Sequence, residues 1–146
     1  VCLMHMRGAP ASMQESPDYI DVVADVRAFL MARAGVCEAA GIARDRIALD
    51  PGFGFGKTRA HNLTLLARLA EIAALGYPVL AGLSRKSTLG AITGRPEDER
   101  VAASVAAALI AVERGAAIVR VHDVRETVDA LKVLDAVADA GGRATP

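Results

Sequence analysis

The sequence predicts a mixed α/β fold in which strands and helices alternate as they do in a (β/α)8 barrel. Four short apolar runs alternate with longer stretches whose apolar residues recur at helical spacing, and strands separated by helices pair in parallel, either in a doubly wound sheet or in a barrel. A polar cluster follows each of the four runs. A barrel brings all such strand ends to one rim, whereas an open sheet brings together only those near its switch point. The pattern therefore favours the barrel.

The predicted strands are short and bounded by turn residues. They cover Val1 to Met4, Arg46 to Leu49, Pro78 to Gly82 and Ala117 to Val121. A complete barrel has eight β/α units in roughly 250 residues. This chain, with 146 residues, supplies about four of them.

A helix is predicted after every strand. The first begins at Ser16-Pro17-Asp18 and runs to residue 40, and the second covers 59–74 behind Thr58 as its cap. A short helix at 87–92 precedes a long one that opens at Pro96, where proline and acidic residues suit an N-terminus. The last helix covers 125–140, and its expected buried stripe is Val128, Leu131, Leu134 and Val137.

Composition limits the classes of function. The formal net charge is zero, which argues against a dedicated nucleic-acid binder, because such a protein needs a basic face. The longest apolar run, Val101 to Val112, falls short of the roughly 18 to 20 residues that span a bilayer. Cys2 and Cys37 lie in apolar surroundings and are expected to be free thiols in a reducing compartment. We therefore expect a cytoplasmic protein without a membrane span.

The segment ALDPGFGFGKT, at residues 48–58, almost matches two phosphate-binding motifs. The P-loop pattern fails because Pro51 stands where its first glycine is needed, and the dinucleotide pattern G-x-G-x-x-G is not present. Asp50 precedes the glycines, and a carboxylate repels phosphate. The loop is thus predicted to present Asp50 to a ligand rich in hydrogen-bond donors.

Four segments, LMHMRGAPASMQ, LDPGFGFGKT, GLSRKSTLG and VRVHDV, occur in this order at successive strand ends. Together they resemble the dihydropteroate synthase family, from Val1 to about Val137. The resemblance implies a (β/α)8 barrel that joins 4-aminobenzoate to the pyrophosphate ester of 6-hydroxymethyl-7,8-dihydropterin. It also implies that residues 1–146 are the C-terminal half of that pterin-binding barrel, roughly its last four β/α units, with the N-terminal half not contained in this chain.

By this resemblance, Asp50 accepts hydrogen bonds from the amino and ring N–H groups of the pterin, and Lys86 donates to the pterin's ring nitrogen and carbonyl side. Arg120 and His122, two residues apart and so on one face of the strand, hold the ring and the pyrophosphate. The three expected catalytic residues are Lys86, Arg120 and His122. The full set of expected substrate contacts is Met4, Asp50, Phe55, Gly82, Lys86, Ser87, Arg120, Val121 and His122.

Within that set, Ser87 is expected to hold the carboxylate of 4-aminobenzoate, and Phe55 to pack against its ring. Met4 and Gly82 supply an apolar floor and clearance for the pterin. Three nearby residues, His5, Lys57 and Arg85, are interpreted instead as groups that order the loops or line the rim.

The resemblance also implies magnesium, with its protein ligand outside this chain, so no metal ligand is assigned here. The helix from Val101 to Val112 is apolar almost all round, which indicates burial on two sides, and a homodimer through it is expected. Two alternatives remain open. One is a non-catalytic barrel fragment or paralogue that keeps the fold and the dimer surface; the other is a different pterin-binding barrel, such as a corrinoid methyltransferase relative.

Overall fold

The structure is a computed structural model and describes residues 1–8 and 17–142. Residues 9–14 of the first motif, and Ser16 of the predicted helix start, lie outside the described residues. In the described part no helix is both long enough and apolar enough to cross a membrane.

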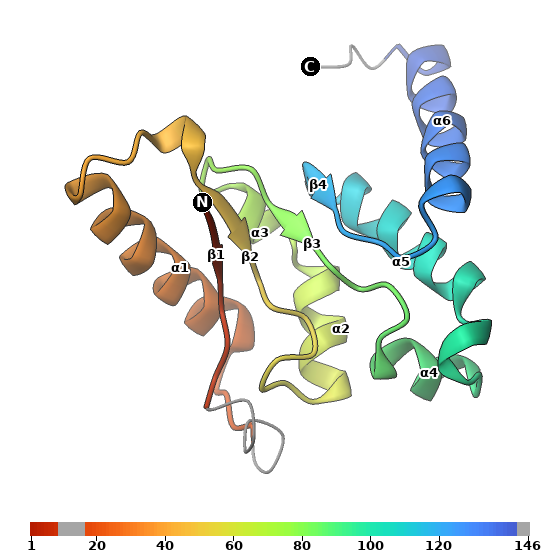
Figure 1. The fold of residues 1–146 in the computed structure, drawn as a ribbon, viewed down its shortest axis with the longest axis horizontal. Coiled ribbons are helices and arrows are strands. Elements are labelled where there is room, and N and C mark those ends of the chain that lie inside the picture. Colours follow the sequence, from red (N-terminus) through yellow and green to blue (C-terminus); the bar gives the residue numbers. More distant parts are fainter. Residues whose placement is uncertain (9–16, 143–146) are drawn as a thin grey trace.

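Four parallel strands form the centre of the molecule, as predicted. They are β1 (Cys2–Met4), β2 (Ala48–Asp50), β3 (Leu80–Ala81) and β4 (Ile118–Val119). β1 pairs with β2, and β3 pairs with β4. A single bridge between Leu49 and Val79 joins the two pairs, so the strands lie side by side in chain order (Figure 1). This order is the one that consecutive strands have in a barrel.

Six α-helices occur in the described residues: α1 (Val22–Ala39), α2 (Arg59–Ala67), α3 (Ala70–Ala73), α4 (Ser87–Thr93), α5 (Val101–Glu113) and α6 (Val124–Ala140). Two 3₁₀ turns, η1 (Arg44–Arg46) and η2 (Glu97–Glu99), precede β2 and α5. Each strand is therefore followed by helix, which confirms the predicted repeat, although several boundaries differ.

The first helix begins four residues later than predicted because Asp21 is its cap. The Asp21 carboxylate accepts hydrogen bonds from the backbone N–H groups of Val23 and Ala24, which leaves the expected start at Asp18 outside the helix. The predicted helix 59–74 is interrupted at Arg68, whose backbone departs from helical geometry. Thr58 does cap it, in a reciprocal capping box with His61.

Pro96 opens the 3₁₀ turn η2 and not α5. Arg100 stands between the turn and the helix, and its guanidinium donates to the carbonyls of Arg85 and Arg95. These bonds tie the start of α5 to the loop that follows β3.

The core lies between the strands and the helices α1 to α3 and α5. Its largest fully buried side chains include Phe53, Leu49 and Val79, with Val23 and Leu65 from the helices. Phe53 comes from the glycine-rich loop after β2, so that loop is anchored in the core at its start.

The predicted buried stripe of α6 is wrong for this chain. Val128 is 41% exposed and Val137 is 65% exposed, while Leu131 and Leu134 are half-buried. The only buried α6 residue among those described is Thr127. The main packing partner of α6 is α5, and Val128 and Val137 remain exposed in the described part of the chain.

The glycine positions predict a measurable difference in stability. Gly52 and Gly94 both have positive φ, but a Cβ on Gly52 would lie 1.8 Å from the His5 carbonyl oxygen, whereas one on Gly94 would meet nothing within 4 Å. Gly94→Ala should cost about 1 kcal/mol of unfolding free energy, from backbone strain alone. Gly52→Ala should cost about 2 kcal/mol more, because the clash is added. Urea unfolding of the complete polypeptide measures both, and equal losses would contradict this account.

Candidate functional site

The strand register brings the predicted polar residues to one edge. Met4 is the register partner of Asp50 across β1 and β2, and the His5 N–H donates to the Asp50 carbonyl at 3.0 Å. At the other pair, the Arg120 N–H donates to the Ala81 carbonyl, also at 3.0 Å. All four strands are parallel, so their carboxyl ends face the same side, as predicted.

Asp50 is a buried carboxylate, only 1% exposed. One of its oxygens accepts a hydrogen bond from the Gly52 N–H at 2.8 Å. The other faces the Arg120 guanidinium, 3.4 Å away. A buried carboxylate is costly unless hydrogen-bonded or paired with a cation, so Asp50 needs donors from the loop and from in front of the strands.

Arg120 lies directly over Gly82. A Cβ at position 82 would come within 2.8 Å of the guanidinium nitrogen, so a larger residue there would displace the Arg120 side chain from this position. The Arg120 side chain is 57% exposed, and it is therefore accessible to a ligand on its outer face.

His122 is oriented by Ser84. The Ser84 hydroxyl oxygen accepts from the His122 backbone N–H at 3.2 Å and lies 2.9 Å from the ring Nδ1, and Ser84 itself is buried. These contacts leave Nε2 as the free ring nitrogen. A small pocket of about 120 Å³ lies here, lined by Gly82, Ser84, Lys86, Arg120, Val121 and His122. Five of these six are predicted site residues, and only Ser84 was not assigned a role.

The Lys86 ammonium lies between this pocket and the glycine loop. It donates a hydrogen bond to the Phe53 carbonyl and stands 4.5 Å from the centre of the Phe55 ring, a cation–π distance. Burial lowers the pKa of Lys86 to about 8, an effect that the nearby Asp50 carboxylate opposes. Lys86, assigned to the pterin, and Phe55, assigned to 4-aminobenzoate, are thus in contact.

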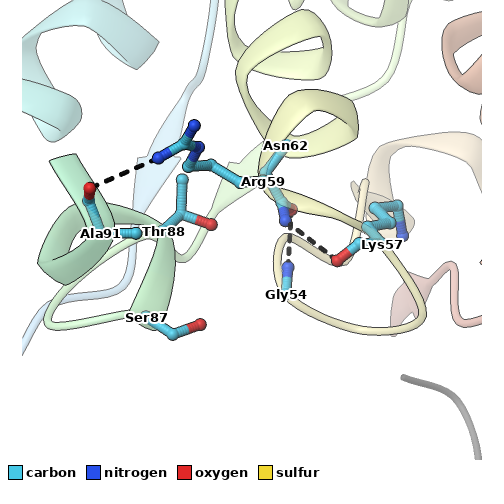
Figure 2. Close-up of a pocket in the computed structure, with 7 residues that line it drawn as sticks. All are labelled: Gly54, Lys57, Arg59, Asn62, Ser87, Thr88 and Ala91. Carbon is cyan, nitrogen blue, oxygen red and sulfur yellow. Dashed lines mark hydrogen bonds between the residues drawn. The ribbon is translucent and has the colours of Figure 1, made fainter. Parts of the chain in front are cut away.

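The glycine loop at residues 52–56 is held by Asn62 on α2, a residue that the sequence analysis missed. The buried Asn62 amide accepts from the Gly54 N–H at 2.7 Å and donates to the carbonyls of Lys57 and Thr58. Figure 2 shows Asn62 between the loop and α2, beside a pocket of about 160 Å³. This pocket is lined by Gly54, Lys57, Arg59, Asn62, Ser87, Thr88 and Ala91. Ser87 therefore opens onto this second pocket and does not line the one with Arg120.

His5, interpreted as a residue that orders its loop, and Lys57 and Arg85, interpreted as structural or rim charges, all make contacts that hold loops together. Arg85, with a positive φ of 58°, forms a two-point ion pair with Asp123 at 2.5 and 3.1 Å. This pair lowers the pKa of the Asp123 carboxyl and joins the loops after β3 and β4. His5 is buried and lies 2.9 Å from the ammonium of Lys57.

Metal-ligating side chains do not gather in the described part of the chain. Within residues 1–8 and 17–142, no group of three or more His, Cys, Asp or Glu residues could hold a metal ion. Cys2 and Cys37 are free thiols. Cys37 is half-buried, but Cys2 is exposed, so its apolar sequence neighbours did not predict a packed side chain.

The chain matches the family model described as "Pterin binding enzyme" over residues 1–122. It is 54% identical over 140 residues to the dihydropteroate synthase of Haemophilus influenzae, an alignment that covers 96% of this chain and 51% of that protein. The chain spans about half the length of the curated relatives it matches.

Solved structures agree with this match. A Burkholderia cenocepacia dihydropteroate synthase complexed with 7,8-dihydropteroate has a TM-score of 0.90 at 60% identity and covers 98% of this chain and 54% of its own. A Xanthomonas albilineans dihydropteroate synthase with 4-aminobenzoic acid has a TM-score of 0.87 at 52% identity, over 99% of this chain and 50% of its own.

The buried His5 predicts an acid-sensitive fold. Burial, and then the Lys57 ammonium, lower the pKa of His5 from 6.5 to about 4. A neutral histidine is favoured in the folded state, so its contribution to stability is complete above pH 6.5 and is lost as the pH falls towards 4. His5→Gln should flatten this part of the stability profile, because the amide oxygen accepts from Lys57 but does not titrate. The test is urea unfolding of the complete polypeptide between pH 4 and 7; the same slope in both proteins would count against the assignment.

Proposed function

Because this chain belongs to the pterin-binding enzyme family, we propose that it is part of a dihydropteroate synthase and forms roughly the last four β/α units of its barrel. The reaction joins 4-aminobenzoate to 6-hydroxymethyl-7,8-dihydropterin pyrophosphate, giving 7,8-dihydropteroate and pyrophosphate. The observation that supports it most directly is the grouping of a buried carboxylate, Asp50, with Lys86 and Arg120 at one strand edge.

The pterin binds, in this proposal, at the pocket in front of β2 to β4. Its 2-amino and ring N–H groups lie side by side, and the Asp50 carboxylate accepts both, replacing the long contact with Arg120. Lys86 donates to the ring nitrogen and carbonyl on the pterin's other side. Arg120 then lies over the ring plane, next to Val121, while Met4 and Gly82 provide the apolar floor and the clearance.

4-Aminobenzoate binds beside the glycine loop. Ser87 opens onto the pocket shown in Figure 2, where its hydroxyl donates to the substrate carboxylate. Phe55, already next to Lys86, packs against the aromatic ring. This arrangement directs the amine of 4-aminobenzoate towards the pterin pocket. The ligand in the Xanthomonas albilineans structure is this same acid, which supports the choice of substrate.

The chemistry is a substitution at the exocyclic methylene carbon of the dihydropterin. The bond from that carbon to the pyrophosphate oxygen breaks, and the amine nitrogen forms the new bond and loses one proton. Arg120 and the free Nε2 of His122 stabilise the charge on the departing pyrophosphate, and Ser84 keeps the His122 ring in place. Positioning and charge stabilisation account for the reaction without a protein nucleophile.

Magnesium remains an expectation for the complete protein. The family resemblance implies that its protein ligand lies outside this chain, and we derive no step through the ion.

We also propose that the complete protein is a homodimer. The outward side of α5 forms, with α2 and α4, an apolar groove of about 290 Å³, and a second copy of the protein fills it.

Loss of Lys86 should remove activity and spare the fold. We expect Lys86→Ala in the complete polypeptide to lower kcat/KM by at least about a hundredfold, because a half-buried charged donor to the pterin is lost. Lys132→Ala is the matched control, since Lys132 is an exposed lysine on α6. The measurements are 7,8-dihydropteroate formation and circular dichroism. Retained turnover in Lys86→Ala would refute its role, and a wild-type protein without turnover would support a non-catalytic paralogue.

A carboxylate introduced into the α5 groove should prevent the dimer from forming. Ala106 lines the groove, and Ala106→Glu places a carboxylate on a surface that the dimer buries. Light scattering at micromolar concentration should show a dimer for the wild type and half that mass for the variant. Ala28→Glu, on the exposed side of α1, should leave the mass unchanged. A wild-type monomer would overturn the assignment.

A further inference from the structure

Lys57 is a buried lysine that the proposed reaction does not use. Its side chain is only 3% exposed, although it follows directly after the glycine loop. Its ammonium turns back beneath the loop and donates to the carbonyls of Gly52 and Phe55, at 2.9 and 3.0 Å. The third contact is the Nδ1 of His5, at 2.9 Å. Lysine is rarely buried to this extent unless it is paired, so these contacts need an explanation.

The three contacts match the chemistry of an ammonium group. An ammonium has three N–H donors and no acceptor, and here it meets three acceptors. His5 accepts only if Nδ1 carries a lone pair. Burial and the neighbouring Lys57 hold the pKa of His5 down to about 4, so at neutral pH its ring is uncharged. The proton of the neutral ring is then on Nε2.

The loop carbonyls are divided between two lysines. Lys57 binds those of Gly52 and Phe55, whereas Lys86 binds that of Phe53. The peptide that Lys57 holds at Phe55 carries the ring that contacts Lys86. Asn62 fixes the intervening Gly54 N–H. The shape of the loop, and with it the place of Phe55, therefore depends on Lys86 and also on Lys57 and Asn62. The last two line the pocket shown in Figure 2 and not the pocket of Arg120.

We propose that Lys57 is a positioning residue, which holds the 52–56 loop from beneath and so sets the Phe55 ring for the aromatic substrate. The expected effect on KM rests on the proposed function, whereas the expected effect on the shape of the 52–56 loop does not. The hydrogen bonds of Lys57 go to the loop and to His5 and not to Asp50 or Arg120, which are assigned to the pterin. Burial lowers the pKa of Lys57, and the Asp50 carboxylate acts on the lysine only through its charge, which raises that pKa. The effect of losing Lys57 should accordingly fall on 4-aminobenzoate and spare the pterin substrate.

The experiment uses Lys57→Ala in the complete polypeptide, with n-propylammonium as the added probe. Propylammonium contains the three carbons and the nitrogen that the substitution removes, and n-propanol is the control of similar size without the charge. The first readout is amide hydrogen exchange of the peptide 51–57, with the α1 peptide as reference. The second is the pair of KM values. Lys57→Met, which keeps most of the side-chain volume, is the second variant, and Lys132→Ala is the control for loss of an exposed lysine.

We expect exchange in both Lys57 variants to rise within 51–57 and to stay unchanged in α1. The KM for 4-aminobenzoate should rise about tenfold, the order expected for hydrogen bonds to a charged group, while the KM for the pterin substrate changes less than about twofold. Propylammonium should reverse both effects in Lys57→Ala, and n-propanol should not.

Unchanged exchange in 51–57 would overturn the proposal, and so would a uniform rise across the whole chain in both variants, because Lys57 would then support the core and not the loop. Equal rescue by n-propanol would also overturn it, since volume and not donors would matter. If the wild type forms no dihydropteroate, the proposed function fails, and the exchange and rescue measurements still decide the role of Lys57.

Discussion

The close approach of the glycine loop to the chain leaving β1 is the constraint on which the site depends. The loop passes so near that a Cβ on Gly52 would overlap the His5 carbonyl, and one on Gly56 would lie 2.3 Å from the Arg7 carbonyl oxygen. This approach brings Lys57 to His5, and it places the Gly52 N–H on the Asp50 carboxylate. Without glycine at these positions the two loops would separate.

The charged side chains around this contact form two layers, one buried and one accessible to solvent. The buried layer contains Asp50, which accepts one hydrogen bond from the loop, and Lys57, which donates two to it. The accessible layer contains Lys86 and Arg120, both with contacts that a ligand can replace. Burial lowers the pKa of Lys57 to about 7 and that of Lys86 to about 8. The buried layer fixes the shape of the site, and the accessible layer is available for recognition.

The strand and helix repeat could be predicted from the sequence, because apolar periodicity and strand-end polarity are local signals. Asp50 was singled out because it follows an apolar strand and precedes the glycines, whereas the roles of Lys86 and Arg120 came from the family resemblance and stay predictions. Asn62 and Ser84 were missed since their roles depend on partners eight and 38 residues away. The α6 stripe was wrong for a different reason: periodicity shows that a face is apolar, and it does not show what covers that face.

In the function proposed above, the strand edge binds a reduced pterin through the Asp50 carboxylate. The most direct test is calorimetric titration of the complete polypeptide with 6-hydroxymethyl-7,8-dihydropterin, for the wild type and for Asp50→Asn, whose amide removes one acceptor and adds donors. We predict that the wild type binds and that the variant binds at least about tenfold more weakly, since a charge-assisted pair of hydrogen bonds is lost. Equal affinity in the two proteins would contradict the account.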